Sequence, residues 1–336
     1  MTNWGILGLG FIADKFIDAI KEVPDTQIKG VASLTKKKTN DLIKKLGINE
    51  NFFYTNYDDL INSSSIDAIY IATLNDTHAE LIKKCALAKK KILCEKPMCV
   101  NLKESKEVFK CLEENNILFL EAFAYRSHQQ TINLCNVINS GEIGQIQSIE
   151  ASFGFKIKKI IPNSRLFNKD NGGGAILDVG CYTSSFCLLI AKTILGEEYK
   201  RYKMRNITGS LCETGVDIHS EAELIFNDKL KMTVKTSLKE NLNNNCIIYG
   251  TKGKIVVSSP WLPENKSYIE IYNKDSYYKQ FVNSKFSIYA QQIYKFNKKI
   301  LNKDDDVFDT LMNNEMSLIN IEIIDMWKKG VENQTS

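Results

Sequence analysis

One residue of this sequence that could take part in catalysis is Lys96, in the tripeptide Glu95-Lys96-Pro97. The tripeptide follows the apolar segment 91–94, which is typical of a buried strand, and open α/β sheets place their ligands at the carboxyl ends of their strands. Pro97 restricts the backbone of Lys96 to extended conformations and so helps to aim its amino group. Glu95 could orient the lysine or bind a ligand hydroxyl. As an isolated tripeptide, however, the same residues could form a surface turn.

A carboxylate and a phenol, Asp178 and Tyr182, are four residues apart, so at the start of a helix they would share one face. The phenol could pass on a proton, and the carboxylate could accept a hydrogen bond from a ligand hydroxyl. Asp178 could instead be a helix cap, and Tyr182 an ordinary half-buried tyrosine. Arg126, His128 and Arg165 could line the same pocket, or each could be an exposed side chain or part of a structural ion pair.

A glycine-rich turn near the N-terminus has the pattern Gly-x-Gly-x-x-Ala, in Gly8-Leu9-Gly10-Phe11-Ile12-Ala13. It follows an apolar strand and opens a helix, which is the context that a dinucleotide-binding turn requires. Gly8 permits the tight turn, and Gly10 lets a pyrophosphate approach the backbone. The pyrophosphate would then accept hydrogen bonds from the N–H groups that open the helix, at Phe11 and Ile12. The alternative is a plain strand-to-helix turn.

The kind of dinucleotide depends on residues about 20 positions further on, where NAD sites usually carry an acidic residue for the ribose hydroxyls. This sequence has Ser33, Leu34 and Thr35 there, followed by Lys36, Lys37 and Lys38. Because no carboxylate is present and three cations follow, we expect NADP as the cofactor, with NAD possible. The lysines could also be only the solvated start of a helix.

The first third of the chain alternates apolar runs with amphipathic stretches, which predicts βαβ units and a parallel sheet. The expected strands are 4–9, 27–33, 52–54, 66–72, 91–94 and 117–121, and the expected helices are 13–23, 39–46, 57–62, 78–89 and 102–115. With right-handed crossovers these elements form an α/β, doubly wound Rossmann domain over residues 1–122.

The remainder, residues 123–336, has longer strands and predicts an α+β domain with a large, mostly antiparallel open sheet and helices on one face. The expected strands are 146–155, 218–226, 230–237, 245–249, 254–257 and 267–272, and the expected helices are 129–139, 183–195 and 313–329. Two domains also follow from the length of 336 residues, which exceeds the usual size of one hydrophobic core.

The composition excludes several classes of protein. A net charge of +4, from 44 basic and 40 acidic residues, is too balanced to indicate nucleic acid or an anionic membrane as partner. No apolar run reaches the roughly 18 residues that span a bilayer, and the N-terminus lacks the pattern of a signal peptide. Nine scattered cysteines without a CxxC pair, and three histidines, predict reduced thiols and no metal site. We therefore expect a cytoplasmic protein that acts on a small molecule.

The order of these motifs resembles the glucose-fructose oxidoreductase / inositol dehydrogenase / MocA-like (Gfo/Idh/MocA) family. The resemblance covers nearly the whole chain and is carried by five segments, which are Gly8–Ala13, Ala72–His78, Glu95–Pro97, Glu121–His128 and Gly172–Tyr182. The Glu-Lys-Pro and Gly-Gly-Gly…Asp-x-Gly-x-Tyr motifs are far more specific than the glycine turn. The sequence is most similar to the branch with dihydrodiol dehydrogenase and NADP-linked xylose dehydrogenase.

The resemblance implies a role for each matching residue. Lys96 would be the catalytic lysine, with a bond to Pro97 that is often cis in this family. Asp178 and Tyr182 would face the nicotinamide across the cleft, and Asp178 would contact substrate. Arg126 and Arg165 are candidate substrate contacts from their residue type alone, with a structural role as the open alternative. The residues implied in cofactor binding are Gly8, Gly10, Phe11, Ile12, Ser33, Lys38, Thr73, Asn75, His78, Glu95 and Lys96.

Two positions depart from the family pattern. Leu74 stands where the family usually has proline, in the loop that covers the cofactor. Leu34 stands where NADP-linked members usually have arginine, so Lys36, Lys37 and Lys38 must then bind the 2′-phosphate.

The resemblance implies hydride transfer between a nicotinamide and the hydroxyl or carbonyl of a sugar, sugar derivative or cyclic diol. Lys96 and Tyr182 would relay the proton, with Tyr182 as acid/base, although the two roles could be exchanged. Two alternatives remain, an isomerase or epimerase that uses its cofactor internally, and a non-catalytic nucleotide sensor. By analogy with the family we also expect a homodimer or higher homo-oligomer that pairs through the C-terminal sheet.

Overall fold

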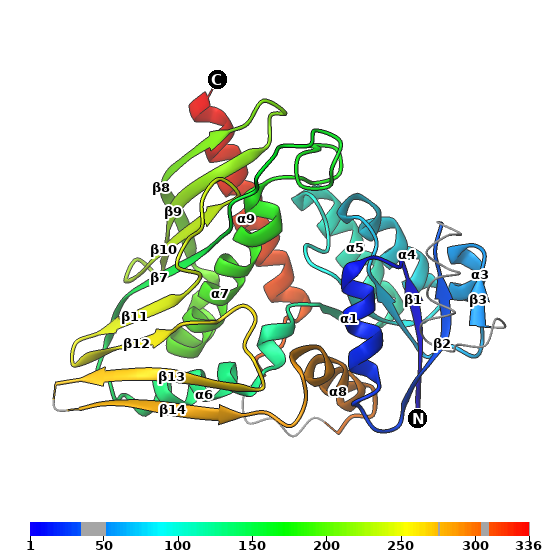
Figure 1. The fold of residues 1–336 in the computed structure, drawn as a ribbon, viewed down its shortest axis with the longest axis horizontal. Coiled ribbons are helices and arrows are strands. Elements are labelled where there is room, and N and C mark those ends of the chain that lie inside the picture. Colours follow the sequence, from blue (N-terminus) through cyan, green and yellow to red (C-terminus); the bar gives the residue numbers. More distant parts are fainter. Residues whose placement is uncertain (35–51, 275, 304–308, 336) are drawn as a thin grey trace.

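The computed structural model describes residues 1–34, 52–274, 276–303 and 309–335. These residues form two β-sheets with a layer of helices between them (Figure 1). Two expected features, the helix at 39–46 and the three lysines at 36–38, lie outside the described residues.

The first sheet has six parallel strands in the order β3-β2-β1-β4-β5-β6, as a doubly wound domain requires. Its strands are β1 (Thr2–Leu7), β2 (Thr26–Ala32), β3 (Phe53–Tyr54), β4 (Ala68–Ile71), β5 (Lys91–Cys94) and β6 (Phe119–Glu121). The helices that cover it are α1 (Phe11–Ile20), α3 (Tyr57–Asn62), α4 (His78–Leu87) and α5 (Leu102–Asn115), with the short turn η2 (Asn75–Thr77) before α4. The expected Rossmann fold is confirmed.

The strand order reverses between β1 and β4, and this reversal positions the cofactor site. Chain segments leave the carboxyl ends of these two strands in opposite directions, so a crevice opens between them. The glycine turn follows β1, and the segment from Ala72 to His78 follows β4. Lys96 follows β5, the next strand in the sheet, and therefore lies at the same edge.

The second sheet has eight strands in the order β14-β13-β12-β11-β7-β10-β9-β8, and only β7 and β10 pair in parallel. Its strands are β7 (Ile146–Gly154), β8 (Tyr202–Leu211), β9 (Asp217–Phe226), β10 (Leu230–Ser237), β11 (Cys246–Gly250), β12 (Gly253–Val257), β13 (Lys266–Asn273) and β14 (Tyr277–Asn283). The mostly antiparallel open sheet is therefore confirmed. Strands β8 and β14 were not predicted, because their apolar residues do not alternate cleanly with polar ones.

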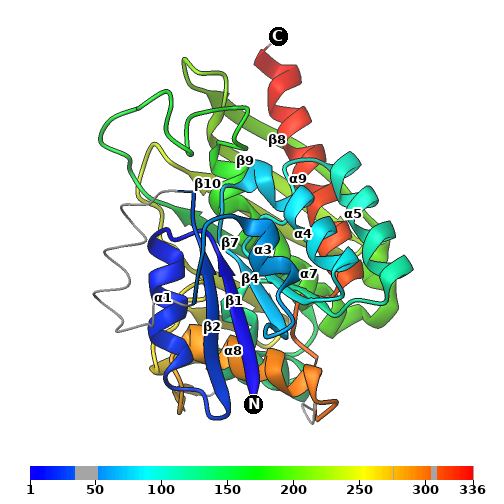
Figure 2. The same cartoon turned by 90° about the vertical axis from the view of Figure 1, so that its right-hand side faces the viewer.

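Helices cover one face of this sheet, the face toward the Rossmann domain. They are η3 (Ala124–Ser127), α6 (Gln129–Ser140), the π-helical turn η4 (Ile176–Gly180), α7 (Cys181–Leu195), η5 (Gly196–Lys200) and α9 (Asn314–Thr335). Helix α9 packs against α7 and strand β8 and also against α5 of the first domain, as Figure 2 shows. The two domains are therefore joined by a layer of helices that both contact, and not only by a short linker.

Helix α7 is the most apolar helix of this layer. The stretch Ile176–Lys200 is long enough and, with a mean hydropathy of 1.4, apolar enough to cross a membrane, but 67% of its apolar window is buried inside the fold. Its side chains pack into the main core with those of β7, β9 and β10. Burial on all sides explains the composition of such a helix.

Helix α8 (Ile288–Ile300) belongs by its packing to the Rossmann layer, although it lies within the range 123–336 expected for the second domain. Helix α8 lies beside α1 (Figure 1), and its residues Ala290, Ile293 and Phe296 join the same core cluster as Trp4 and Phe16. The Trp4 and Phe296 rings are 5.2 Å apart between centroids. The chain thus returns to cover the first sheet, which no local sequence pattern indicated.

Candidate active site

The turn after β1 has the geometry that a pyrophosphate needs. Gly8 has φ +87°, and a Cβ there would lie 2.6 Å from the main-chain oxygen of Ala72, so only glycine fits between the two strand ends. Gly10 begins α1 in an extended conformation without a side-chain cap, and a Cβ there would meet nothing within 4 Å. Open space therefore remains beside Gly10 at the N-terminus of α1, where the N–H groups that open a helix favour an anion.

The end of β2 borders the same space. Ser33 comes directly after this strand, and Leu34 is exposed. Lys38, expected beside a 2′-phosphate, lies outside the described residues. The fit of a dinucleotide to this structure therefore depends on the open glycine turn.

Lys96 lies where the two domains meet. Its Nζ donates a hydrogen bond to the main-chain oxygen of Asp178 at 2.7 Å and lies 3.7 Å from the carboxylate of the same residue. The same Nζ is 4.8 Å from the centroid of the Tyr182 ring, a distance typical of a cation–π contact. The Lys96–Pro97 bond is cis. The structure thus brings together the three residues expected to be catalytic.

Asp178 is held between two cations. Its carboxylate lies 2.8 Å from Arg165 Nη1, and its side chain is only 8% exposed. Burial alone would raise the pKa of this carboxyl group, but the charges of Lys96 and Arg165 outweigh burial and hold the pKa below its usual value. Asp178 therefore stays ionised at neutral pH and can accept a hydrogen bond from a hydroxyl group. Arg165 is 49% exposed on the outer side of the pair.

Tyr182 is fixed by an aromatic cluster. Its ring makes edge contacts with Phe123 and Phe153, with both centroid distances 5.4 Å, and Trp261 lies 6.3 Å away. Its hydroxyl takes part in no hydrogen bond with the residues that the structure describes. Burial raises the pKa of Tyr182 well above its usual value, and the negative charge of Glu95 adds to the shift. The phenol therefore keeps its proton at neutral pH.

Glu95 is anchored from the first sheet. It is buried and accepts a hydrogen bond of 2.5 Å from the hydroxyl of Tyr70 on β4, whose ring stacks on Phe16 of α1. Burial raises the pKa of Glu95, although the Tyr70 hydroxyl and Lys96 oppose the shift. Glu95 therefore has a fixed orientation beside the lysine.

A second buried carboxylate, Glu121, stabilises the turn that follows Lys96. Located at the end of β6, it accepts a hydrogen bond of 3.0 Å from the main-chain N–H of Met98, two residues after Lys96. Burial raises the pKa of Glu121 to about 7, even though Met98, Arg126 and Lys96 favour the ionised form. Glu121 thus fixes the turn that follows Lys96.

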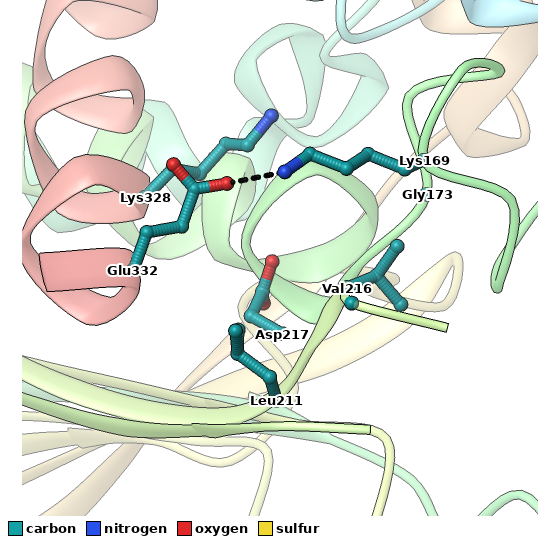
Figure 3. Close-up of a pocket in the computed structure, with 8 residues that line it drawn as sticks. Lys169, Gly173, Leu211, Val216, Asp217, Lys328 and Glu332 are labelled. Carbon is teal, nitrogen blue, oxygen red and sulfur yellow. Dashed lines mark ion pairs between the residues drawn. The ribbon is translucent and has the colours of Figure 1, made fainter. Parts of the chain in front are cut away.

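Asp217, the first residue of β9, fixes the turn that carries Asp178. Its carboxylate accepts a hydrogen bond of 2.7 Å from the main-chain N–H of Ile176, at the start of the π-helical turn η4. Gly174 has φ +116°, and a Cβ there would lie 2.3 Å from the Asp217 carboxylate. Figure 3 shows Asp217 below the ion pair between Lys169 and Glu332. Gly174 is therefore required by close packing against this buried acid, whereas a Cβ at Gly172 would meet Val100 and one at Gly173 the main-chain oxygens of Leu166 and Asn168.

The loop after β4 joins the cofactor side to the second domain. Asn75 donates a 3.4 Å hydrogen bond to the main-chain oxygen of Gly172, in the triple-glycine segment. His78 is buried, with Nδ1 2.9 Å from the oxygen of Pro97 and Nε2 3.3 Å from that of Thr73. Because burial lowers its pKa, His78 is neutral and can donate to only one of these oxygens. His78 therefore holds the loop against the Lys96–Pro97 turn rather than pointing into open space.

Arg126 does not lie where the sequence suggested. It is fully buried, and its guanidinium donates hydrogen bonds to the main-chain oxygens of Thr310, at 3.1 Å, and Ser185. His128 caps α6 by accepting a hydrogen bond from the N–H of Gln130. Both residues therefore hold α6, α7 and the segment before α9 together, and the expected substrate contact of Arg126 does not fit this structure.

Four supporting residues escaped the sequence analysis, namely Tyr70, Glu121, Phe153 and Asp217. Tyr70 and Phe153 read as ordinary strand residues. Glu121 and Asp217 could have been suspected, since each is an acidic residue at the boundary of an apolar strand. Within the described ranges, no group of three His, Cys, Asp or Glu side chains converges in a way that could hold a metal ion.

The comparisons with known proteins agree with this geometry. A family model described as "Oxidoreductase family, NAD-binding Rossmann fold" matches residues 2–123, and the C-terminal model of the same GFO/IDH/MocA family matches residues 132–256. The chain belongs to this oxidoreductase family. It is the family that the sequence motifs resemble, so the first domain is an NAD-binding Rossmann domain and the protein is an oxidoreductase.

Curated relatives of this oxidoreductase include trans-1,2-dihydrobenzene-1,2-diol dehydrogenases. The enzyme from Xenopus tropicalis is 30% identical over 78% of this chain and 77% of its own length, and the human enzyme is 28% identical over 78% and 76%. Among solved structures, the fold resembles an aldose-aldose oxidoreductase from Caulobacter crescentus, with TM-score 0.86, 19% identity and coverage of 99% and 98%. It also resembles a 3-ketoreductase from Actinomadura kijaniata in complex with NADP and TDP-benzene, with TM-score 0.84, 22% identity and coverage of 98% for both chains.

The two glycines of the turn can be separated by experiment. We expect Gly10→Ala to leave the free energy of unfolding within about 1 kcal/mol of the wild type, because the added methyl group meets open space. It should nevertheless weaken NADP⁺ binding by about tenfold or more, since the methyl group occupies the approach to the pyrophosphate. Gly8→Ala should lower both stability and affinity. Calorimetric titration and chemical unfolding of both variants check this, and normal NADP⁺ affinity in Gly10→Ala would contradict the site.

Glu121 makes stability depend on pH in a predictable direction. The folded protein keeps this proton up to about pH 7, whereas the unfolded chain loses it near the ordinary value of 4.5. The free energy of unfolding therefore falls as the pH rises through this window, by up to about 3 kcal/mol from this group. In Glu121→Gln this part of the fall should be missing in urea unfolding between pH 5 and 8. The exposed Glu113→Gln variant is the control, and equal slopes in all three proteins would rule the assignment out.

Proposed function

We propose that this oxidoreductase is an NADP-preferring dehydrogenase or reductase that acts on the hydroxyl or carbonyl group of a sugar, a sugar derivative or a cyclic diol. The observation that carries the proposal is the contact of Lys96 with Asp178 and Tyr182 beside the open glycine turn. Residues 1–122 would bind the cofactor, and residues 123–336 would bind the substrate and support oligomerisation. NAD remains the possible alternative cofactor.

The relatives support the substrate and cofactor classes. The curated relatives are named as dehydrogenases of a cyclic diol, and the two structural neighbours are named as enzymes of aldoses and of a keto group. The ketoreductase structure contains NADP. An ionised Asp178 with exposed space on its Arg165 side suits a substrate with a second hydroxyl, as in a polyol or sugar ring.

When bound, the nicotinamide supplies or accepts the hydride, and the protein must orient the substrate and move one proton. Asp178 would accept a hydrogen bond from a neighbouring hydroxyl and so fix the ring. Lys96 would hold the reacting oxygen and stabilise its negative charge. Tyr182 would donate its proton to that oxygen during reduction, because burial keeps the phenol protonated. During oxidation Lys96 would first release a proton to solvent, Tyr182 would then pass its proton to the Lys96 amine, and the substrate hydroxyl would give its proton to Tyr182.

The first test is an assay of reduced nicotinamide with NADP⁺ or NAD⁺ and a panel of aldoses, inositols and cyclic diols. We expect turnover with one class and a preference for NADP⁺. Lys96→Met and Tyr182→Phe should lower kcat by at least about 100-fold, as removal of a general acid or base usually does. The exposed Lys103→Met variant should keep full activity.

Other outcomes have distinct meanings. Nucleotide binding without net turnover would favour the internal-redox isomerase or the nucleotide sensor. Full activity in both Lys96→Met and Tyr182→Phe would contradict the proposed relay. Absence of nucleotide binding would contradict the cofactor site.

We further propose a cytoplasmic location and pairing through the open face of the second sheet. All nine cysteines are free thiols, which suits a reducing compartment. On the outer two strands, the open face carries the cross-strand pairs Tyr268–Phe281 and Tyr272–Tyr277, and Phe281 is 74% exposed. Exposed aromatic rows of this kind are typical of interfaces.

Sedimentation of the wild type should therefore show a dimer or larger oligomer. Phe281→Asp combined with Tyr277→Asp should shift it toward the monomer, because two charges would be buried in the interface. Leu87→Asp, at an exposed position on α4, should leave the oligomer intact. A wild-type monomer at micromolar concentration would refute this pairing.

A further inference from the structure

A second pocket lies outside the cluster of Lys96, Asp178 and Tyr182. It has a volume of about 490 Å³, which is in the range of small-molecule sites. One wall is the segment that continues β7, residues 156–160, and the other is formed by the ends of β9 and β10. In Figure 1 this segment belongs to the green loops above the helical layer.

The rim of the pocket is strongly cationic. Four lysines, Lys156, Lys158, Lys159 and Lys239, line it against a single acidic residue, Glu213. All four lysines are exposed, and none forms an ion pair with another described residue. Elsewhere on the surface many lysines are paired, as Lys203 is with Asp228 and Lys231 with Glu223. Unpaired cations that converge on one concave site create a potential that attracts an anion.

The floor of the pocket is apolar. It is formed by Phe167, Ile157, Ile160, Ile218 and Leu238, and Phe167 and Leu238 are almost fully buried. These side chains belong to a small hydrophobic cluster separate from the main core. A cationic rim over an apolar floor matches a ligand that combines several negative charges with an apolar or planar part.

Two chain segments connect this pocket to the catalytic residues. Phe153 on β7 packs against the Tyr182 ring, and Ile157, four residues further along nearly extended chain, lines the pocket. The main chain of this stretch bonds to β10 and its extension through the N–H groups of Phe155 and Ile157. Four residues of strand span at most about 13 Å.

The other connection runs through Arg165 and Phe167. Arg165 pairs with Asp178, and Phe167 is two residues later. Two extended residues span at most about 7 Å. Pocket and cleft are therefore neighbours on the same side of the sheet, close enough for one molecule to occupy both.

We propose that this second pocket binds the phosphorylated end of an extended substrate, while the reacting hydroxyl or carbonyl group of the same molecule reaches Lys96 and Tyr182. The phosphate groups contact the four lysines, and the organic part next to them rests on the apolar floor. This inference rests on the function proposed above and narrows its substrate class to phosphate esters, with a diphosphate ester satisfying the cationic rim best.

The experiment uses full-length protein saturated with NADP⁺, so that the glycine turn is already occupied. Calorimetric titrations compare uridine 5′-diphosphate, inorganic pyrophosphate and uridine as probes. We expect the diphosphate nucleoside to bind more tightly than pyrophosphate, uridine to bind weakest, and the affinity of both anions to fall with salt. Lys158→Gln combined with Lys159→Gln should weaken both anions about tenfold or more. Ile160→Ala should weaken only the probe that carries the nucleoside.

The matched control is Lys106→Gln combined with Lys110→Gln, which removes the same charge from the exposed face of α5. It should bind all three probes as the wild type does. Equal losses of anion affinity in the two double variants would show a non-specific charge effect and would contradict the proposed anion site. So would the absence of anion binding by the NADP⁺-bound protein.

Kinetics then decide whether the pocket serves the reaction. For phosphorylated substrates, Lys158→Gln with Lys159→Gln should raise KM with little change in kcat, and KM for neutral substrates should not change. Turnover of neutral substrates alone would overturn the proposal and leave the dehydrogenase function intact. If NADP⁺ itself fails to bind, the proposed function fails, and the same titrations without nucleotide still decide whether the pocket binds anions.

Discussion

The hydrogen bond from Lys96 to the main-chain oxygen of Asp178 is the contact on which the site depends. It joins the end of β5 in the first sheet to the π-helical turn before α7 in the second domain. A lysine that is only 14% exposed needs polar partners, because a buried and unpaired charge is very costly. Both sides of the contact must therefore be held at a fixed separation, and the layer of helices shared by the two domains, in which α9 packs against both α7 and α5, holds them there.

Each end of this contact is supported by its own buried carboxylate. Glu121 holds the turn after Lys96 through the N–H of Met98, and Asp217 holds the start of η4 through the N–H of Ile176. In both cases burial raises the pKa, to about 7 for Glu121 and to about 6 for Asp217. An acid whose pKa is raised by burial lowers the stability of the fold as the pH rises, and the main-chain N–H that it accepts only partly offsets this cost. Asp178 is the opposite case, since two cations keep it ionised.

The sequence predicted the parts of the molecule that depend on local physics. The glycine turn, the Rossmann strands and the Lys96–Asp178–Tyr182 set each carry a spacing or a backbone requirement that only certain residues meet. Arg126 shows the limit of such reasoning, because an arginine beside a functional motif looks the same whether it points into the cleft or into the core. Helix α8 was missed because its place is set by contacts between residues far apart in the chain, such as Trp4 and Phe296, which no local pattern records. Strands β8 and β14 pair with the strands next to them in the chain, but they were missed because their apolar residues do not alternate cleanly with polar ones.

The same distinction explains why the chemistry of this protein is easier to derive than its substrate. Lys96, Asp178 and Tyr182 lie on the ends of a strand and a helix, where backbone geometry limits the choice of residues. The long segment between β7 and η4, residues 155–175 of the described chain, contains no helix or strand and reaches Asp178 through Arg165. That segment carries Arg165, which meets Asp178, and three of the four lysines of the second pocket. The segment therefore connects the cationic pocket to the Asp178 carboxylate. We therefore expect substrate specificity to depend on the segment 155–175, whereas Lys96, Asp178 and Tyr182 are held by the elements that it connects.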